Sequence, residues 1–243
     1  MAKSVFITGV SGGIGKAVAL RLARDGYSVA GVYNRNVSGA EELGAQLKKA
    51  GAVFRLYEAD LAEPDAAQAV FMQAEKDSGG FYAVINCAGV ALSKLTQDVT
   101  ADEYNRVFNV NFGSVFNICR LALPYMIKEQ RGKIINISSI WGVKGASCET
   151  LYSASKAAVI GFTKALAREV APSNIQVNCI APGVIDTAMN NHLSDREKAE
   201  LAAEIPAGRF GKPDEIAGLV SFLAGDNSSY ITAQVITADG GLI

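Results

Sequence analysis

Two kinds of hydrophobic pattern alternate along the chain. Short apolar runs rich in Val, Ile, Phe and Tyr alternate with longer stretches in which apolar residues recur every three to four positions. The short runs are typical of strands buried on both faces, and the longer stretches are typical of amphipathic helices. This alternation predicts an α/β fold with a doubly wound, seven-stranded parallel sheet, helices on both faces and right-handed crossovers.

The pattern gives approximate bounds for each element. The predicted strands cover residues 5–8, 28–33, 53–58, 82–86, 133–138, 175–180 and 234–237. The predicted helices cover residues 14–25, 39–50, 64–78, 101–127, 152–170 and 214–224. Pro124 lies in the longest of these helices and is expected to kink it or to start a new segment.

No linker, repeat or low-complexity segment is visible, so residues 1–243 are expected to form a single domain. A chain of 243 residues that is 49% hydrophobic can fill one α/β core but is short for two. Residues 185–209 break the alternation with a polar, charged stretch just beyond a predicted strand. Because ligands bind beyond the carboxyl ends of strands in open α/β sheets, we expect a substrate lid here; a solvated insertion is the alternative.

Composition and charge narrow the class of function. A net charge of −1 argues against a nucleic-acid-binding protein. No apolar run approaches the about 20 residues that a membrane helix needs, and the chain enters its first strand without a signal peptide. We therefore expect no membrane partner and a cytoplasmic location. With one histidine and four cysteines about thirty residues apart, no metal site is expected.

A glycine-rich loop, residues 8–15, lies between the first predicted strand and the first predicted helix. It reads Thr8-Gly9-Val10-Ser11-Gly12-Gly13-Ile14-Gly15. Glycines let the backbone turn sharply and approach a pyrophosphate, whose charge is stabilised at a helix N-terminus. The strand, loop and helix in this order predict a dinucleotide-binding fold of the Rossmann type.

A second pattern supplies acid–base chemistry. Tyr152 and Lys156 are four residues apart on a predicted helix, so both side chains lie on one face. A nearby ammonium group favours the phenolate, and we therefore expect Lys156 to lower the pKa of Tyr152. Ser138 and Ser139 end the fifth predicted strand upstream, and strand alternation sends their side chains in opposite directions.

Taken together, these motifs resemble the short-chain dehydrogenase/reductase family, and the resemblance runs from Lys3 to the C-terminus. Within the family the chain is most similar to the bacterial 3-oxoacyl-(acyl-carrier-protein) reductases. The marks, in order, are Thr8-Gly9, Gly13-Ile14-Gly15, Asp60-Leu61, Asn86-Cys87-Ala88-Gly89, Asn109-Val110-Asn111, Ser139, Tyr152, Lys156 and Pro182-Gly183.

The resemblance implies a role for each site residue. Ser139 would orient a substrate carbonyl, Tyr152 would transfer the proton, and Lys156 would bind the nicotinamide ribose. Asn111 would support a water relay to that lysine. The implied cofactor-binding residues are Thr8, Gly9, Ser11, Gly13, Ile14, Gly15, Asn34, Arg35, Asp60, Leu61, Asn86, Ala88, Gly89, Tyr152, Lys156, Pro182, Gly183, Ile185 and Thr187.

The end of the second predicted strand favours NADP(H) over NAD(H). NAD-preferring relatives carry an Asp there, whereas this chain reads Asn34-Arg35, and Arg35 could contact a 2′-phosphate. A second basic marker of many NADP-preferring relatives is absent, because Gly12 takes its place in the glycine loop. NAD(H) therefore stays possible.

Several substrates fit the resemblance. The first is a 3-oxoacyl group on acyl carrier protein, although Gln130 and Ser173 replace arginines of carrier-docking relatives, and Lys128, Arg131 and Lys133 would have to substitute. The second is a 5-aminopentanone group on elongation factor P, because the run around Glu149 resembles reductases assigned to it. A polyol or sugar dehydrogenase and a non-catalytic dinucleotide-binding regulator are further alternatives.

A homotetramer is expected from the resemblance and from the apolar C-terminal strand and tail, which would leave an exposed sheet edge. The long helices at 101–127 and 152–170 would form a second interface. Its candidate anchors are Phe108, Phe112, Phe116 and Phe162.

Overall fold

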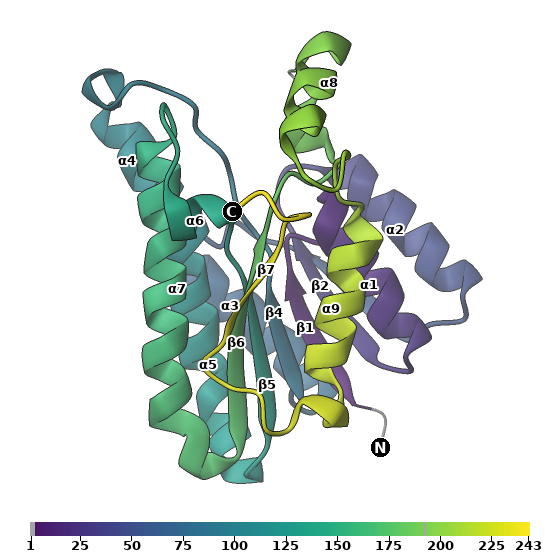
Figure 1. The fold of residues 1–243 in the computed structure, drawn as a ribbon. Helices are drawn as coiled ribbons and strands as arrows, with labels where there is room; N and C mark the ends of the chain where they lie inside the picture. Colours follow the sequence, from purple (N-terminus) through teal and green to yellow (C-terminus); the bar gives the residue numbers. More distant parts are fainter. Residues whose placement is uncertain (1–2, 192) are drawn as a thin grey trace.

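The computed structural model describes residues 3–191 and 193–243, and a seven-stranded parallel sheet forms its centre (Figure 1). The strand order is β3-β2-β1-β4-β5-β6-β7. The strands are β1 (Ser4–Thr8), β2 (Ser28–Tyr33), β3 (Phe54–Glu58), β4 (Ala83–Asn86), β5 (Gly132–Ile137), β6 (Ile175–Pro182) and β7 (Val235–Ala238). The order reverses between β1 and β4, and ligands of open α/β sheets bind beyond the carboxyl ends of the strands at such a switch point. The predicted fold class is confirmed.

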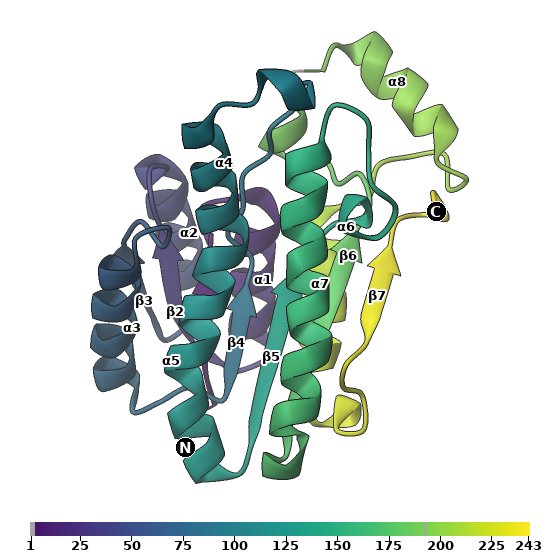
Figure 2. The same ribbon diagram turned by 90° about the vertical axis from the view of Figure 1, so that its left-hand side faces the viewer.

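Helices cover both faces of the sheet (Figures 1 and 2). One face carries α1 (Gly13–Arg24), α2 (Val37–Lys49) and α9 (Pro213–Ala224), and the other carries α3 (Pro64–Ser78), α5 (Ser114–Glu129) and α7 (Thr150–Val170). The remaining helices are α4 (Ala101–Phe108), α6 (Ile140–Lys144) and α8 (Asp195–Glu204). Within the described ranges, no helix is long and apolar enough to cross a membrane.

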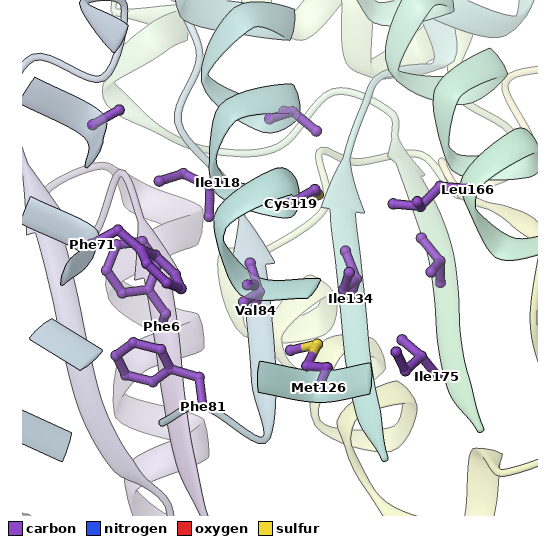
Figure 3. Packing of buried hydrophobic residues seen from close by; sticks show 14 of the residues in the cluster. Phe6, Phe71, Phe81, Val84, Ile118, Cys119, Met126, Ile134, Leu166 and Ile175 are labelled. Atoms are coloured by element: carbon purple, nitrogen blue, oxygen red, sulfur yellow. The ribbon is translucent and has the colours of Figure 1, made fainter. Parts of the chain in front are cut away.

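Two hydrophobic cores, one on each face, hold the layers together. Successive residues of a strand point to opposite faces, so Phe6 enters one core while Val5 and Ile7 enter the other. Around Phe6, the rings of Phe71 and Phe81 have centroids 5.0 and 5.2 Å away, respectively (Figure 3). These edge-on and tilted ring contacts fix the end of β1 and, with it, the start of the glycine-rich loop.

The predicted helix at 101–127 is wrong in its interior. A π-helical turn at Asn109–Gly113 separates α4 from α5, and α5 continues through Pro124 to Glu129. Pro124 therefore starts no new segment. The interruption falls where Asn111 turns into the interior to bond the backbone of Val90, and π-turns in α-helices often occur at functional sites.

The predicted lid region at 185–209 contains a short 3-10 turn at Ala188–Asn190 and the helix α8. Helix α8 stands away from the body of the molecule in both ribbon views, and none of its residues is buried. Ile205, just after α8, is buried and begins the return of the chain to the core. The predicted lid also includes His192, which lies outside the described residues.

Candidate active site

The two serines after β5 point in different directions. The hydroxyl of Ser138 donates to the backbone carbonyl of Lys156 at 2.8 Å. This bond holds the segment after β5 against α7. Ser139 begins α6, and its hydroxyl oxygen accepts from the backbone N–H of Trp141 at 3.2 Å. The side chain of Ser139 also acts on the phenol of Tyr152, whose pKa it lowers. The structure therefore brings Ser139, not Ser138, to Tyr152.

Tyr152 and Lys156 are both buried on α7. The ammonium nitrogen of Lys156 lies 5.8 Å from the centroid of the Tyr152 ring. It donates to the backbone carbonyl of Ile137, the last residue of β5, at 3.0 Å. This bond holds the ammonium group at the carboxyl end of the sheet, next to the ring of Tyr152.

Burial controls the pKa values of this pair. Removal from water raises the pKa of Tyr152 to about 12, the hydrogen bond with Ser139 opposes that rise, and the charge of Glu149 adds to it. Burial also lowers the pKa of Lys156. The expected lowering of the phenol pKa by Lys156 is therefore not found in the protein alone, because desolvation of Tyr152 is the larger effect. At neutral pH Tyr152 is a protonated acid.

Asn111 is fully buried and ties the loop after β4 to α7. Its side-chain oxygen accepts from the backbone N–H of Val90 at 2.8 Å, and its amide nitrogen donates to the Val90 carbonyl at 3.0 Å. The same nitrogen donates to the Ser155 hydroxyl at 2.9 Å. A Cβ atom on Gly89 would lie 3.1 Å from the nitrogen of Lys156 and 3.4 Å from the Asn111 oxygen, so Asn111 and Lys156 flank one point of the backbone.

The glycine-rich loop packs closely against the end of β4. Gly9 has a φ of +71°, and a Cβ atom there would lie 2.8 Å from the Cα of Ala88. The hydroxyl of Thr8 accepts from the backbone N–H groups of Cys87 and Ala88, each at 3.0 Å. Thr8, Gly9 and Ala88 therefore meet in one place, although they come from strands far apart in the sequence.

The start of α1 offers a fit for a pyrophosphate. Its first turn contains no acidic residue, and within the described residues no side chain caps it. The backbone of Gly12, Gly13 and Ile14 enters the helix directly after Ser11. A glycine-lined helix N-terminus with unused N–H groups suits a dinucleotide pyrophosphate. Gly15 is required for a different reason, because a Cβ there would collide with the Gly9 carbonyl.

Two of the residues that the resemblance assigns to the cofactor, Asp60 and Asn86, differ in where their side chains point. Asp60 follows β3, where its carboxylate accepts from the backbone N–H of Ala62 at 3.0 Å, and the neighbouring Leu61 is buried. The side chain of Asn86 points into the interior instead of toward the sheet edge. Its nitrogen donates to the Asn136 oxygen at 2.8 Å, and its oxygen has no hydrogen-bond partner among the described atoms. Only the backbone of Asn86 is available to a cofactor.

The end of β2 contains a residue that the sequence prediction missed. Asn34 is half-buried, and Arg35 is exposed with no partner for its guanidinium group among the described residues. Asn36 caps α2 by accepting from the Gly39 N–H at 3.0 Å, and it donates to the Ser11 carbonyl at 2.9 Å. This side chain connects the glycine-rich loop to the end of β2. An Asn just before a helix was the available signal.

The segment after β6 returns to the glycine-rich loop. Gly183 donates its N–H to the Ala238 carbonyl at 3.0 Å, directly after the buried Pro182. A Cβ atom on Gly13 would lie 2.7 Å from the Thr187 methyl group, so Thr187 covers the loop, whereas Ile185 points into the core. A cavity of about 210 Å³ lies beside this segment, lined in part by Ile185, Arg209, Glu215 and Asp239.

Lys133 cannot serve as the surface basic residue that was expected near a carrier protein. It is 3% exposed at the amino end of β5, and its ammonium group donates to the buried Ser228 hydroxyl at 3.0 Å. That expectation was wrong, because the first residues of a central strand are covered on both faces. In residues 3–191 and 193–243, no three His, Cys, Asp or Glu side chains are grouped to hold a metal ion.

Known proteins share this arrangement over the whole chain. The family described as enoyl-(acyl carrier protein) reductase matches residues 9–243. A 3-oxoacyl-[acyl-carrier-protein] reductase of Thermotoga maritima is 39% identical, with 99% of this chain and 98% of that protein covered. An uncharacterized oxidoreductase of Bacillus subtilis is 40% identical, with 99% of both chains covered.

A solved structure agrees with these sequences. A doubly substituted short-chain dehydrogenase/reductase of Serratia marcescens superposes with a TM-score of 0.92 at 35% identity, covering 99% of this chain and 97% of that one. The expected resemblance is confirmed. The chain belongs to the short-chain dehydrogenase/reductase family, and it is an NAD(P)-dependent oxidoreductase that acts on carbonyl and hydroxyl groups.

Proposed function

We propose that the protein reduces a ketone to a secondary alcohol with NADPH, and that its substrate is a 3-oxoacyl group carried on acyl carrier protein. The observation that supports this best is a buried, protonated Tyr152 beside the hydroxyl of Ser139 and the ammonium group of Lys156. Such a tyrosine is an acid at neutral pH, as reduction of a carbonyl requires.

Each catalytic side chain has a defined role in this proposal. Ser139 donates its hydroxyl hydrogen to the substrate carbonyl oxygen, while its own oxygen accepts from the Trp141 N–H. Tyr152 gives its phenolic proton to that oxygen. Lys156 binds the ribose and supports reprotonation of Tyr152, with Asn111 holding the backbone beside it. When bound, the nicotinamide supplies the hydride.

The proposed cofactor site follows the carboxyl edge of the sheet from β3 to β6. The glycine-rich loop takes the pyrophosphate, Asp60 and Leu61 take the adenine, and the backbone of Asn86, Ala88 and Gly89 follows the ribose. Pro182, Gly183, Ile185 and Thr187 flank the nicotinamide. Arg35 is exposed at the end of β2 without an acidic neighbour in the stretch 34–36, which supports NADP(H) over NAD(H).

A second substrate, the 5-aminopentanone group on elongation factor P, is favoured by two observations. The charge of Glu149 raises the pKa of Tyr152, and such a carboxylate would attract a cationic amine. In addition, Gln130 and Ser173 lie where carrier-docking relatives have arginines, and Lys133 is buried. Lys128 and Arg131 remain for a carrier protein. A polyol dehydrogenase or a silent regulator has no comparable support.

We further propose that residues 185–209 act as the substrate lid and that the assembly is a homotetramer in the cytoplasm. Helix α8 has no buried residue, which suits a segment that closes over a ligand.

Of the four expected anchors of the tetramer interface, Phe112 and Phe162 pack partly against the core, whereas Phe116 is 46% exposed on α5. Phe108 stacks on the ring of Tyr104, which is itself 50% exposed. These exposed rings support an interface along α4 and α5.

Oxidation of NADPH and of NADH by the purified protein would test the function. The probes are acetoacetyl-CoA, ethyl acetoacetate and 5-aminopentan-2-one. Reduction of acetoacetyl-CoA with NADPH as the better cofactor is expected. A catalytic efficiency that is higher with the aminoketone than with acetoacetyl-CoA, and that Glu149→Gln lowers, would change the proposed substrate. The carrier would then be elongation factor P instead of acyl carrier protein. A catalytic efficiency with NADH that equals or exceeds that with NADPH would refute the proposed contact between Arg35 and the 2′-phosphate.

A further inference from the structure

Two loops beside the catalytic tyrosine are joined to each other. Residues 90–99 follow β4, and residues 145–150 connect α6 to α7. The backbone N–H of Lys94 donates to the Cys148 carbonyl at 2.6 Å, and the hydroxyls of Thr96 and Thr150 are 2.8 Å apart. We call these four residues, Lys94, Thr96, Cys148 and Thr150, the loop clasp.

The backbone of Cys148 is the unusual part of the loop clasp. Its φ is +61°, in the left-handed region that residues with a Cβ seldom adopt. Gln130, Asn174 and Ala233 share this conformation, and the first two end helices, where it is common. Cys148 instead precedes the helix that carries Tyr152. Its left-handed turn directs the carbonyl to Lys94, and strain of this kind often marks a functional position.

The loop clasp lies on the substrate side of the site. Residues 90–99 begin at Val90, which Asn111 holds by two hydrogen bonds, and end where Thr100 caps α4. The ammonium group of Lys94 also contacts both oxygens of Glu103, 3.0 Å from each. Thr150 is the first residue of α7, only two positions before Tyr152. The residues proposed to bind the adenine ring follow β3, whereas Asn86, Ala88 and Gly89, proposed to follow the ribose, come just before Val90.

We propose that the loop clasp is a positioning element for the carbonyl substrate. It joins the loop after β4 to the start of α7 and so fixes the wall of the crevice against which the substrate rests beside Tyr152. Loosening it changes the substrate KM without changing NADPH binding. This inference rests on the proposed ketone reduction only for the kinetic part of its test.

Cys148 provides matched variants for that test. Cys148→Val places a β-branched residue in the left-handed region, where it is strongly disfavoured, and so releases the Lys94 N–H. Cys148→Gly keeps the conformation without a penalty, and Cys148→Ala removes only the thiol. We expect about a three- to tenfold rise in KM for acetoacetyl-CoA in Cys148→Val and values near wild type in the other two. The NADPH dissociation constant, measured by quenching of Trp141, the single tryptophan, stays unchanged.

The threonine pair gives an independent measurement. Thr96→Val and Thr150→Val break the same contact, so the double variant is expected to raise KM no more than either single variant. Fully additive effects of the two threonine variants on KM would overturn the proposal. Equal KM values for Cys148→Val and Cys148→Ala would also overturn it. So would a loss of NADPH affinity in Cys148→Val that is as large as its rise in KM.

Amide hydrogen exchange separates this inference from the choice of substrate. The Lys94 amide is expected to exchange faster in Cys148→Val than in Cys148→Gly, because only valine removes its acceptor. If the wild-type protein reduces none of the probes, the proposed substrate fails while this comparison still stands. Equal exchange of the Lys94 amide in the two variants would overturn the loop clasp.

Discussion

Replacing Asn111 with alanine is expected to destabilise the fold as well as to lower turnover. The side chain is fully buried and makes three hydrogen bonds, two to the backbone of Val90 and one to the Ser155 hydroxyl. At about 1 kcal/mol net for each bond, Asn111→Ala loses about 3 kcal/mol of unfolding free energy. In a protein of this size, that loss lowers the thermal midpoint by about 6–12 °C.

The loss of activity has a separate physical reason. Val90 follows Gly89, whose backbone lies so close to Lys156 that an added Cβ would be 3.1 Å from the ammonium nitrogen. Without Asn111, this backbone is free to move, and the position of Lys156 is no longer fixed. Turnover of acetoacetyl-CoA is therefore expected to fall, by up to about a hundredfold for a displacement on the order of 1 Å.

Urea denaturation and steady-state kinetics on the same preparations would measure both effects. Ser155→Ala is the control, because it removes one of the three Asn111 bonds together with the bond from the Ser155 hydroxyl to the Tyr152 carbonyl, and it is expected to cost about 2 kcal/mol. If Asn111→Ala lost activity at unchanged stability, Asn111 would act on the chemistry alone and its bonds to Val90 would have no structural importance. Wild-type behaviour in both assays would refute both parts of the reasoning.

Four further predictions concern the site and the assembly. Tyr152→Phe should abolish turnover and keep NADPH affinity, whereas Lys156→Ala should lower both turnover and NADPH affinity. Substantial ketone reduction by Tyr152→Phe would contradict the role of Tyr152 as the acid. Unchanged NADPH affinity in Lys156→Ala would contradict the role of Lys156 in binding the ribose. Alcohol oxidation needs the phenolate, and because the pKa of Tyr152 is raised to about 12, its rate should rise with pH up to the alkaline limit. Glu149→Gln removes a charge that raises this pKa, so the midpoint of the oxidation profile should move to lower pH, and a fixed midpoint would exclude that influence. Light scattering should give about four times the 25.5 kDa chain mass, and a monomer at micromolar concentration would remove the proposed tetramer.

The pKa of Tyr152 also affects stability at high pH. Its folded value of about 12 lies above the ordinary value of about 10. The folded state thus holds the proton more tightly than the unfolded chain does. The stabilising contribution is complete below pH about 10 and is lost as pH rises toward 12.

The sequence by itself was sufficient for the fold, and it named the groups that are proposed to carry the chemistry. Apolar runs and helical periods alternate because a parallel sheet buries both faces of its strands, so the order of elements can be read directly. The glycine-rich loop and the spacing of Tyr152 and Lys156 are local patterns within a few residues, and local geometry is sufficient to interpret them.

The tertiary structure decided which environment each group experiences. Tyr152 has a raised pKa because the packing around it excludes water, and no local spacing reports that desolvation. The inward turn of Asn86, the burial of Lys133 and the π-turn that brings Asn111 to Val90 all depend on partners far away in the sequence. The loop clasp joins residues about fifty positions apart through the left-handed Cys148. Such contacts arise only when distant strands pair, so their energies are properties of the assembled sheet rather than of any one segment.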